Sequence, residues 1–571
     1  MDGLRIPLSS PSLVSEVWDK LFEGYFDHDE LLASVKYGWD LSFKDSPEPR
    51  DSQWNHPSAT SHEHDVQAYI DKELRFGAMV GPFTDQDLPF PVFASPMGSV
   101  PKSNSDTTRT ITDCSQHGTG INHWIDAHVH RGTYWNINLP TTNHIVQGIK
   151  RQRLRHPGKR IMLFKIDFSR YYRFFLVDPG QTPFLAVKWK GDTFIDRSFG
   201  FGNRGACLGS QRHSDAIAWF FRCRVPPFPG SVNSGTSCKC LCPCFCGDNE
   251  AFPYVDDVVC VVAEDQAEYL FNMLLAIIRQ LGLQPSSTPG HIVPPSVVCV
   301  CLGIEFNLVN NTIALPMVKL EEIITLLKCW LDKTMATKRE IKRLAGKLLF
   351  CSRVVHTGRL HLNRIFDAER RSTHLDSQVP VDLNLRLDVE WWLSILQDWN
   401  GISFLEFTPA GTVAVDASEK GIGGKPAIAG FNFMSGEFYK TVVPKEFEHW
   451  HIADLEFLAH IVAVRLWSPG WSGLQIDGKT DNKATELLLK SGKSRVDKRL
   501  VLARTFSALQ FRFKFQWQSD RVTSQKNILP DSLTRFDLPA KRALFWSHCA
   551  ELGINPVECS LNKDLFVWAH L

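Results

Sequence analysis

The sequence predicts a mixed chain in which an α+β portion with a helical extension precedes a separate α/β domain. Residues 161–305 alternate short β-rich runs, such as IMLFKIDF and YVDDVVCVVA, with helical stretches. A helical pattern opens at Thr337. After a polar break at 399–411, the runs TVAVD, DLEFLAHIVAVRLW and LQID have the patterns of a strand, a helix and a strand. At 571 residues the chain is long enough for roughly three to four domains.

These patterns divide the chain into six expected segments. We expect a partly disordered lead-in over 1–60, short strands with Pro and Gly turns over 61–160, an α+β body over 161–315, a helical segment over 316–405, an α/β domain over 406–537, and a C-terminal tail over 538–571.

Composition narrows the class of protein. Hydrophobic residues make up 43% and charged residues 22%, which is an ordinary balance for a globular chain. The N-terminus lacks a basic segment followed by an apolar run, and no apolar stretch reaches the roughly 18 residues of a membrane span. We therefore expect a soluble intracellular protein, cytoplasmic or nuclear, with no membrane partner. The 15 cysteines are mostly scattered and are expected to be free thiols.

The helical segment is basic. Thr337 and Glu340 fit a capping box, and apolar residues follow at helical spacing. Between residues 317 and 371 there are 13 Lys/Arg and 6 Asp/Glu, an excess of 13 − 6 = 7 in a chain whose net charge is +1. A nucleic-acid backbone could lie on such a surface, although a solvated helical face explains the charge equally well.

One group of acidic residues surrounds the sequence Tyr254-Val255-Asp256-Asp257. Adjacent side chains of a continuous strand point to opposite faces, so two neighbouring aspartates share a site only at a hairpin tip, and the flanking β-rich runs suit a hairpin. Asp167 ends the strand IMLFKID. Three carboxylates on neighbouring strands would bind two Mg²⁺ ions about 4 Å apart.

The four-residue motif alone is a weak signal, and its context strengthens it. Between Asp167 and Asp256 lies a Gly-rich segment that contains Gly200 and Gly202. Lys102 and Arg109 flank a turn upstream, where they could grip phosphates. Taken alone, two such cations more often belong to an exposed basic loop.

A second acidic group lies in the C-terminal α/β domain. Its members are Asp416 at the end of TVAVD, Glu456 in the helix HIADLEFLAH, Asp481 after a strand, and Asp531 in NILPDSLTR. Glu456 lies outside the apolar stripe of its helix. Each residue alone would ordinarily be a surface carboxylate, but four of them in order after the first group indicate a second metal site.

The order of these motifs resembles that of reverse transcriptases. SPMGSVPK…TRTITDCS, KIDFSRYYRFFLVDP, FGFGNRG…QRHSDAI, YVDDVV and CLGIEFN…LPMVKLEEI are similar to finger, palm and primer-grip motifs, most of all those of DIRS-like, tyrosine-recombinase retrotransposons. The resemblance covers about residues 90–535. It implies a right-hand polymerase with fingers (61–160), palm (161–315) and helical thumb (316–405), followed by a ribonuclease H-like domain (406–537).

The resemblance also implies roles for single residues. Asp167, Asp256 and Asp257 become metal ligands of the polymerase, and Asp416, Glu456, Asp481 and Asp531 become those of the ribonuclease H. Lys102 and Arg109 become triphosphate contacts, and Gly200 and Gly202 line the substrate. Tyr172 becomes a steric gate against a ribose 2′-hydroxyl, although an aromatic residue there is more often core packing.

Several positions depart from the family pattern. Tyr171 follows Arg170 where the family has a small residue, and its bulk could crowd a triphosphate. His291 replaces a lysine thought to protonate pyrophosphate, and Arg521 stands where many members have a histidine. The run Cys238, Cys240, Cys242, Cys244, Cys246 suits an insertion loop better than zinc, whose structural sites favour C-x₂₋₄-C spacing.

The expected function is therefore Mg²⁺-dependent RNA-directed DNA synthesis, with Mn²⁺ as an alternative ion, together with hydrolysis of RNA in RNA–DNA hybrids. The expected partners are an RNA template, a DNA primer, the hybrid and deoxynucleoside triphosphates. Protease, integrase and recombinase signatures are absent from the sequence, so separate recombinase and capsid-like chains would supply those activities. The main rival is a catalytically silent nucleic-acid-binding protein that keeps the fold. An RNA-dependent RNA polymerase is disfavoured by Tyr172 and by the second acidic group.

Overall fold

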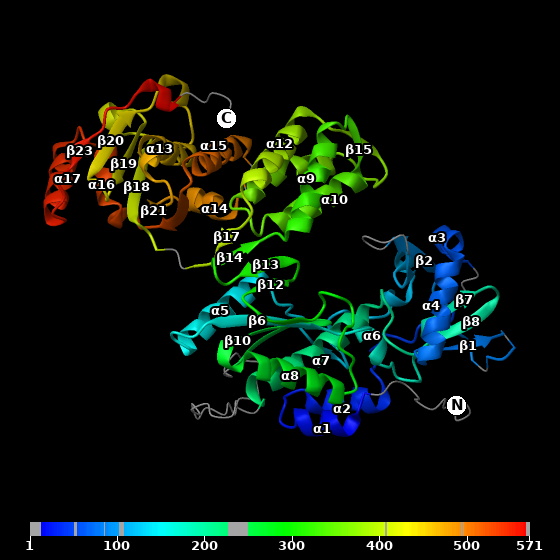
Figure 1. Cartoon of the computed structure of the whole chain (residues 1–571). Helices are drawn as coiled ribbons and strands as arrows, with labels where there is room; N and C mark the ends of the chain where they lie inside the picture. Colours follow the sequence, from blue (N-terminus) through cyan, green and yellow to red (C-terminus); the bar gives the residue numbers. More distant parts are fainter. Residues whose placement is uncertain are drawn as a thin grey trace. The chain divides into compact units, whose positions relative to one another are not determined.

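The structure is a computed structural model of the whole chain (Figure 1). It describes residues 13–50, 54–84, 86–88, 90–101, 108–225, 249–405, 408–492, 494 and 496–566. The chain divides into two compact units, Met1–Asn310 and Asn311–Leu571.

A four-stranded antiparallel sheet forms the centre of the first unit, with the strand order β11-β6-β10-β9. Its strands are β6 (Ile161–Asp167), β9 (Glu250–Tyr254), β10 (Asp257–Ala263) and β11 (Val293–Ser296). Alternate residues of β6 and β10, including Phe164 and Cys260, enter one large core. The helices α7 (Arg204–Cys223) and α8 (Glu264–Gln280) contribute Phe221 and Phe271 to the same core. This sheet lies within residues 161–315, the segment expected to be the palm.

The N-terminal region corrects the expectation of a loosely folded lead-in. Within 1–60 the chain forms α1 (Ser15–Phe22) and α2 (His28–Tyr37). Trp18 is 1% exposed, and its Nε1 donates to the carbonyl oxygen of Leu281 at 3.0 Å. Asp27 forms a buried ion pair with Arg212 of α7 at 2.5 Å. These helices belong to the same core as the sheet, because Trp18, Phe22 and Leu31 lie among its buried residues and the ring of Phe22 contacts that of Phe220 on α7.

The expected fingers also have a different boundary. The strands β1 (Met79–Phe83), β7 (Ala186–Trp189) and β8 (Asp192–Asp196) form one sheet, so residues 186–196, expected in the palm, belong here. Beside it lie α4 (Glu63–Phe76) and the hairpin of β2 (Met97–Pro101) and β3 (Thr108–Thr112). Glu73 of α4 pairs with Arg170 at 2.7 Å and Arg173 at 2.9 Å, which ties the fingers to the segment that follows Asp167.

The second unit begins with a helical module. Its helices are α9 (Met317–Leu331), α10 (Lys338–Cys351), α11 (Asn363–Arg370) and α12 (Leu383–Asp398). The predicted capping box is confirmed, since the Thr337 side chain accepts from the Glu340 N–H while the Thr337 N–H donates to Glu340 Oε2.

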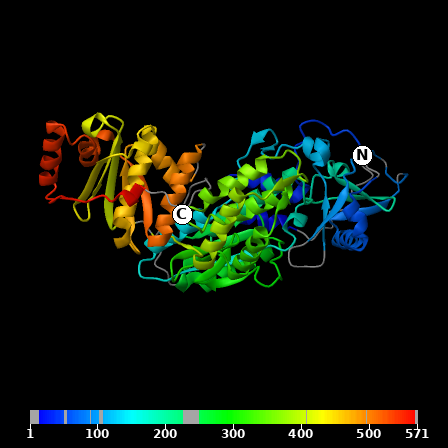
Figure 2. The same cartoon turned by 90° about the horizontal axis from the view of Figure 1, so that it is seen from above.

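The rest of the second unit is a six-stranded sheet with the order β22-β21-β18-β19-β20-β23. The strands are β18 (Gly411–Ser418), β19 (Ala427–Asn432), β20 (Glu437–Val442), β21 (Gln475–Thr480), β22 (Gln516–Arg521) and β23 (Val557–Glu558). β18 pairs antiparallel with β19 and parallel with β21. The helices α13 (Ile452–Trp467), α14 (Lys483–Ser491) and α15 (Asp497–Phe513) share one core with this sheet, and α16 (Ile528–Thr534) and α17 (Pro539–Glu551) share another. The sheet lies between these two groups in Figures 1 and 2.

The expected C-terminal tail is part of this domain. Phe545 of α17 is fully buried and contacts the rings of Phe431 and Phe438 on the sheet. β23 pairs with β20 at the sheet edge. The sequence analysis did not identify α17 as a helix with an apolar face, so it ended the domain at residue 537, before α17 and β23.

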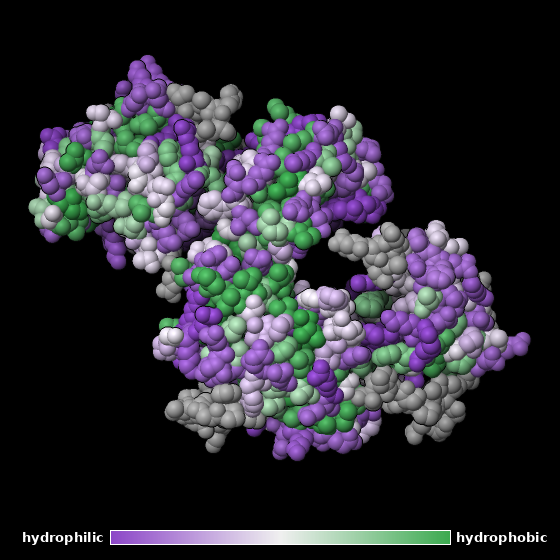
Figure 3. Space-filling view, viewed as in Figure 1, coloured by the Kyte–Doolittle hydropathy of each residue, from purple (hydrophilic) through white to green (hydrophobic). Residues whose placement is uncertain are grey.

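The described helices include none that combines the length and the apolar character needed to cross a bilayer. In the space-filling view, hydrophobic side chains gather in small groups among hydrophilic ones (Figure 3).

Candidate functional site

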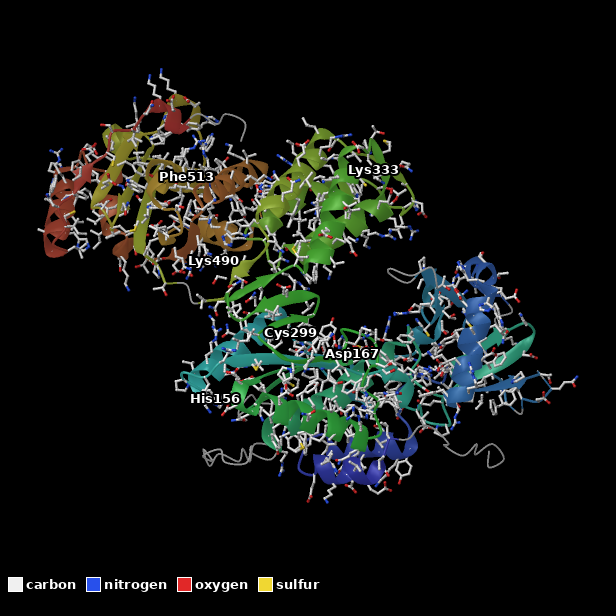
Figure 4. The ribbon with its side chains drawn as sticks, viewed as in Figure 1. His156, Asp167, Cys299, Lys333, Lys490 and Phe513 are labelled. Carbon is white, nitrogen blue, oxygen red and sulfur yellow. The ribbon has the colours of Figure 1, made fainter. Side chains whose placement is uncertain are left out.

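The first acidic site is built on the hairpin between β9 and β10. Asp257 begins β10 and lies directly opposite Asp167 in the strand register. Asp256 precedes it at the hairpin tip, and its carbonyl oxygen accepts from the Phe168 N–H at 2.8 Å. Val255 has a left-handed backbone with φ of 54°, which turns the chain sharply between the strands. The structure therefore brings Asp167 and Asp257 onto the paired strands β6 and β10 and Asp256 onto the turn between β9 and β10; Asp167 is labelled in Figure 4.

Two basic side chains contact these carboxylates. Lys165 Nζ lies 3.2 Å from Asp257 Oδ1, and His291 Nδ1 lies 3.2 Å from Asp167 Oδ2. Lys165 was missed by the sequence reading, although residues i and i+2 of a strand share a face, so its position two before Asp167 was an available signal. The predicted role of His291 toward pyrophosphate stays a prediction, because here its contact is a carboxylate.

Burial and mutual repulsion determine the electrostatics of this site. Burial, and after it the neighbouring carboxylate of Asp257, raises the pKa of Asp167 to about 6. Burial also raises the pKa of Asp256. A divalent cation would relieve both effects, so the donor set suits Mg²⁺ chemically.

The concern that Tyr171 crowds a triphosphate is wrong for this arrangement. Its side chain is 2% exposed and lies in the palm core, where its ring stacks on Phe168 at 4.7 Å. Its hydroxyl lies 2.7 Å from Ser214 Oγ. The side chain faces the core because the short helix Tyr171–Phe174 turns it toward α7.

Two of the predicted substrate contacts, Arg109 and Tyr172, flank a third side chain, Phe201. The guanidinium of Arg109 lies over the ring of Phe201 at 5.7 Å, and that ring lies 5.6 Å from Tyr172. Phe201 is 39% exposed and stands between Gly200 and Gly202 in the Gly-rich segment. Phe201 was missed by the sequence reading, and no spacing signal separates it from other loop aromatics.

The two glycines differ in what they require. Gly202 has φ of +99°, and an added Cβ would lie 2.8 Å from the carbonyl oxygen of Thr112, so a side chain is excluded there. At Gly200 an added Cβ would make only an ordinary contact, at 3.6 Å from Asp196 Oδ2. Lys102 and the run Cys238–Cys246 lie outside the described residues.

The second acidic site lies in the six-stranded domain. Asp416 belongs to β18, Glu456 to the first half of α13, and Asp481 directly follows β21. One ligand atom from each of these three residues lies within 4.8 Å of the others, and no other group of three potential metal ligands this close was found among the described residues. β18 and β21 are parallel neighbours, which is why their carboxyl ends meet.

This second site fits a divalent cation. Glu456 is 3% exposed, and its buried Oε2 has no hydrogen-bond partner, as expected of an oxygen that needs a further ligand. Burial raises the pKa of Asp416 to about 7, and burial followed by Asp416 holds the pKa of Glu456 well above its usual range. Carboxylates in this state bind a cation in place of a proton.

The fourth predicted acid stands apart from the group. Asp531 forms ion pairs with Arg535 and with Lys541, whose Nζ lies 2.5 Å from Oδ2. Two of the other carboxylates accept hydrogen bonds from hydroxyls that the sequence analysis missed. Thr534 donates to Asp416 Oδ2 at 2.9 Å, and Ser524 donates to Asp481 Oδ2 at 2.6 Å. Arg521, at the position of the family's histidine, donates to the carbonyl oxygen of Asp481 at 3.2 Å.

Comparisons with known proteins give structural neighbours only. No protein-family model matches the sequence, and no curated protein matches it. A foamy viral protease-reverse transcriptase in complex with RNA/DNA hybrid is 12% identical over 90% of this chain and 64% of that chain, with a TM-score of 0.48. The foamy viral enzyme with double-stranded DNA is 12% identical over 90% of this chain and 99% of that chain, with a TM-score of 0.47. Its dRH form with double-stranded DNA is 13% identical over 90% and 83%, with a TM-score of 0.47.

Proposed function

We propose that this chain is an RNA-directed DNA polymerase with an attached ribonuclease H, encoded by a DIRS-like retrotransposon. The observation that carries the proposal is the presence, in one chain, of a hairpin that sets Asp256 and Asp257 beside Asp167 and of a separate buried cluster of Asp416, Glu456 and Asp481. The ordered polymerase-like motifs around the hairpin support the choice of reaction.

In the polymerase site, Asp167, Asp256 and Asp257 would hold two Mg²⁺ ions. Bound ions of this kind activate the attacking hydroxyl and neutralise charge on the leaving phosphates. Arg109 would bind the triphosphate through its guanidinium fork, and the face of Tyr172 would reject a ribose 2′-hydroxyl. His291 would release Asp167 and hold a proton near the leaving pyrophosphate.

In the ribonuclease H site, Asp416, Glu456 and Asp481 would hold the ions beside the scissile RNA phosphate. Thr534 and Ser524 orient two of these carboxylates through hydrogen bonds. Asp531 would join them when substrate binds, by breaking its ion pairs with Arg535 and Lys541 and turning to the metal site. The partners are an RNA template, a DNA primer, the hybrid and deoxynucleoside triphosphates, and separate chains of the element would supply recombinase and capsid-like functions.

One assay tests the polymerase directly. Mg²⁺-dependent incorporation of dTTP on oligo(dT)-primed poly(rA) is measured for the native chain and for Asp256→Asn/Asp257→Asn. We expect incorporation by the native chain and none by the double variant, while both bind the hybrid and keep their circular dichroism spectra. A folded native chain that binds the hybrid without incorporation would favour the rival, a silent nucleic-acid-binding protein. Its palm carboxylates would then stay paired with Lys165 and His291.

A further inference from the structure

The tip of the catalytic hairpin has a backbone that needs outside support. Val255 has φ of 54°, in the left-handed region that β-branched residues rarely adopt. Such a residue keeps this conformation only when its surroundings hold it. Its side chain is 8% exposed and belongs to the palm core, but burial alone does not fix the orientation of the peptide groups on either side.

Both backbone polar groups of Val255 are bonded to one helix, α7. The Val255 N–H donates to Gln211 Oε1 at 2.8 Å, and its carbonyl oxygen accepts from the Ser214 hydroxyl. Gln211 Nε2 also donates to the carbonyl oxygen of Pro253, at 3.0 Å, and to Asp215 Oδ1, at 2.9 Å. Gln211 and Ser214 are three residues apart, so they lie on the same face of the helix.

Tyr171 extends this contact to the neighbouring strand. A carbonyl oxygen only accepts, so the Ser214 hydroxyl proton serves Val255. The Tyr171 hydroxyl lies 2.7 Å from Ser214 Oγ and 3.3 Å from the carbonyl oxygen of Ser210, so its single proton can serve either of these two acceptors. The ring of Tyr171 stacks on Phe168 with an interplanar angle of 18°. Phe168 directly follows Asp167, so Tyr171 contacts one carboxylate segment through Phe168 and reaches the other through Ser214, which bonds Val255.

We propose that Tyr171, Gln211 and Ser214, named here the hairpin anchor, are positioning residues that hold the tip so that Asp256 and Asp257 face Asp167. This inference rests on the proposed polymerase function. It assigns a role to Tyr171, the residue that departs from the family pattern: its hydroxyl fixes Ser214, and Ser214 fixes the Val255 carbonyl. The three side chains are 2% exposed or less, so none of them contacts substrate directly.

The test uses Tyr171→Phe and Ser214→Ala in the full chain, with Tyr439→Phe as the matched control. Tyr439 is also buried, and its hydroxyl donates to a backbone carbonyl, that of Ala459, in the other unit. Hydrogen–deuterium exchange at the amides of residues 254–257 reports the anchor without any need for activity. We expect faster exchange there in both anchor variants and unchanged exchange in Tyr439→Phe.

The kinetic part separates positioning from general stability. We expect kcat for dTTP incorporation to fall by about tenfold in Ser214→Ala, with KM for dTTP within about twofold of the native value. Because Tyr171 acts through Ser214, the double variant should resemble Ser214→Ala alone. Unchanged exchange at 254–257, or equal loss of kcat in Tyr439→Phe, would overturn the anchor. Faster exchange in the two anchor variants, together with no dTTP incorporation by the native chain, would keep the anchor and reject the polymerase.

Discussion

The two carboxylate sites differ in how their negative charge is balanced. In the palm, Asp257 contacts Lys165 and Asp167 contacts His291, each at 3.2 Å. In the six-stranded domain, the ligand atoms of Asp416, Glu456 and Asp481 lie within 4.8 Å of one another, and burial and mutual repulsion keep the pKa values of Asp416 and Glu456 raised. A metal ion entering the palm competes with side-chain cations, whereas one entering the second site competes mainly with protons.

The largest expected effect separates the two sites. Asp416→Asn/Glu456→Gln should lower the rate of RNA cleavage in a hybrid on the order of a thousandfold or more, because the ion loses two of its ligands. Incorporation of dTTP should stay within about twofold of native. The reciprocal control is Asp256→Asn/Asp257→Asn, which should keep its cleavage. Loss of both activities in either double variant would mean that the sites are not independent.

A smaller effect is expected at Asp531. Its carboxylate is held by Arg535 and Lys541 outside the close group, so Asp531→Asn should lower RNA cleavage by only about tenfold. Single-turnover cleavage of a labelled hybrid measures this, with Glu456→Gln as the comparison. If the two variants lose equal activity, Asp531 is a full member of the metal site in the working enzyme.

Removal of the Lys165 ammonium group from the first site should raise the affinity for Mg²⁺ modestly. Lys165→Met frees Asp257 from its ion pair, so the Mg²⁺ concentration for half-maximal incorporation should fall by about fivefold, the equivalent of about 1 kcal/mol. The Mg²⁺ dependence of RNA cleavage should not move, and this serves as the internal control. A rise in the half-maximal concentration would show that Lys165 assists metal binding.

The last expected effect concerns stability and not activity: the free energy of unfolding should depend on pH. The folded-state pKa of Asp416, about 7, lies above its usual value of 3.8, so the metal-free fold favours the protonated group. In EDTA, the contribution of Asp416 should therefore be fully present below about pH 4 and decline as the pH rises toward 7. Thermal unfolding across this range measures it. Mg²⁺ should reduce the decline, and Asp416→Asn should have a smaller one, because only Glu456, whose pKa is also raised, then remains of the buried pair. A decline of native size in Asp416→Asn would contradict the contribution assigned to Asp416.

Sequence reasoning located the two sites better than their surroundings. The placement of Asp167 beside Asp256 and Asp257 followed from strand alternation and a hairpin, which are local rules. The ion pairs of Asp531 could not be predicted, because Lys541 lies in a helix that the sequence pattern left in the tail. The contacts of Gln211 and Ser214 with Val255 join residues more than 40 apart in sequence, and no periodicity reports such a contact.

The N-terminal helices were missed for a related reason. α1 and α2 have 8 and 10 residues, which is short for a periodicity argument, and the residues that cover them come much later in the chain. Their apolar side chains were therefore read as part of a polar, mixed segment, although Trp18 and Phe22 are each 1% exposed.

The long separation between Trp18 and its partner Leu281 has a consequence for biosynthesis. Trp18 leaves the ribosome 263 residues before Leu281 does. At roughly 5–20 residues per second, this delay lasts about 13–53 s, during which the core around Trp18 lacks Leu281. The first unit therefore cannot complete its core until nearly its whole length is synthesised. Its nascent form would expose aromatic surface during that time, so the yield of folded protein should depend on chaperones and on the speed of translation.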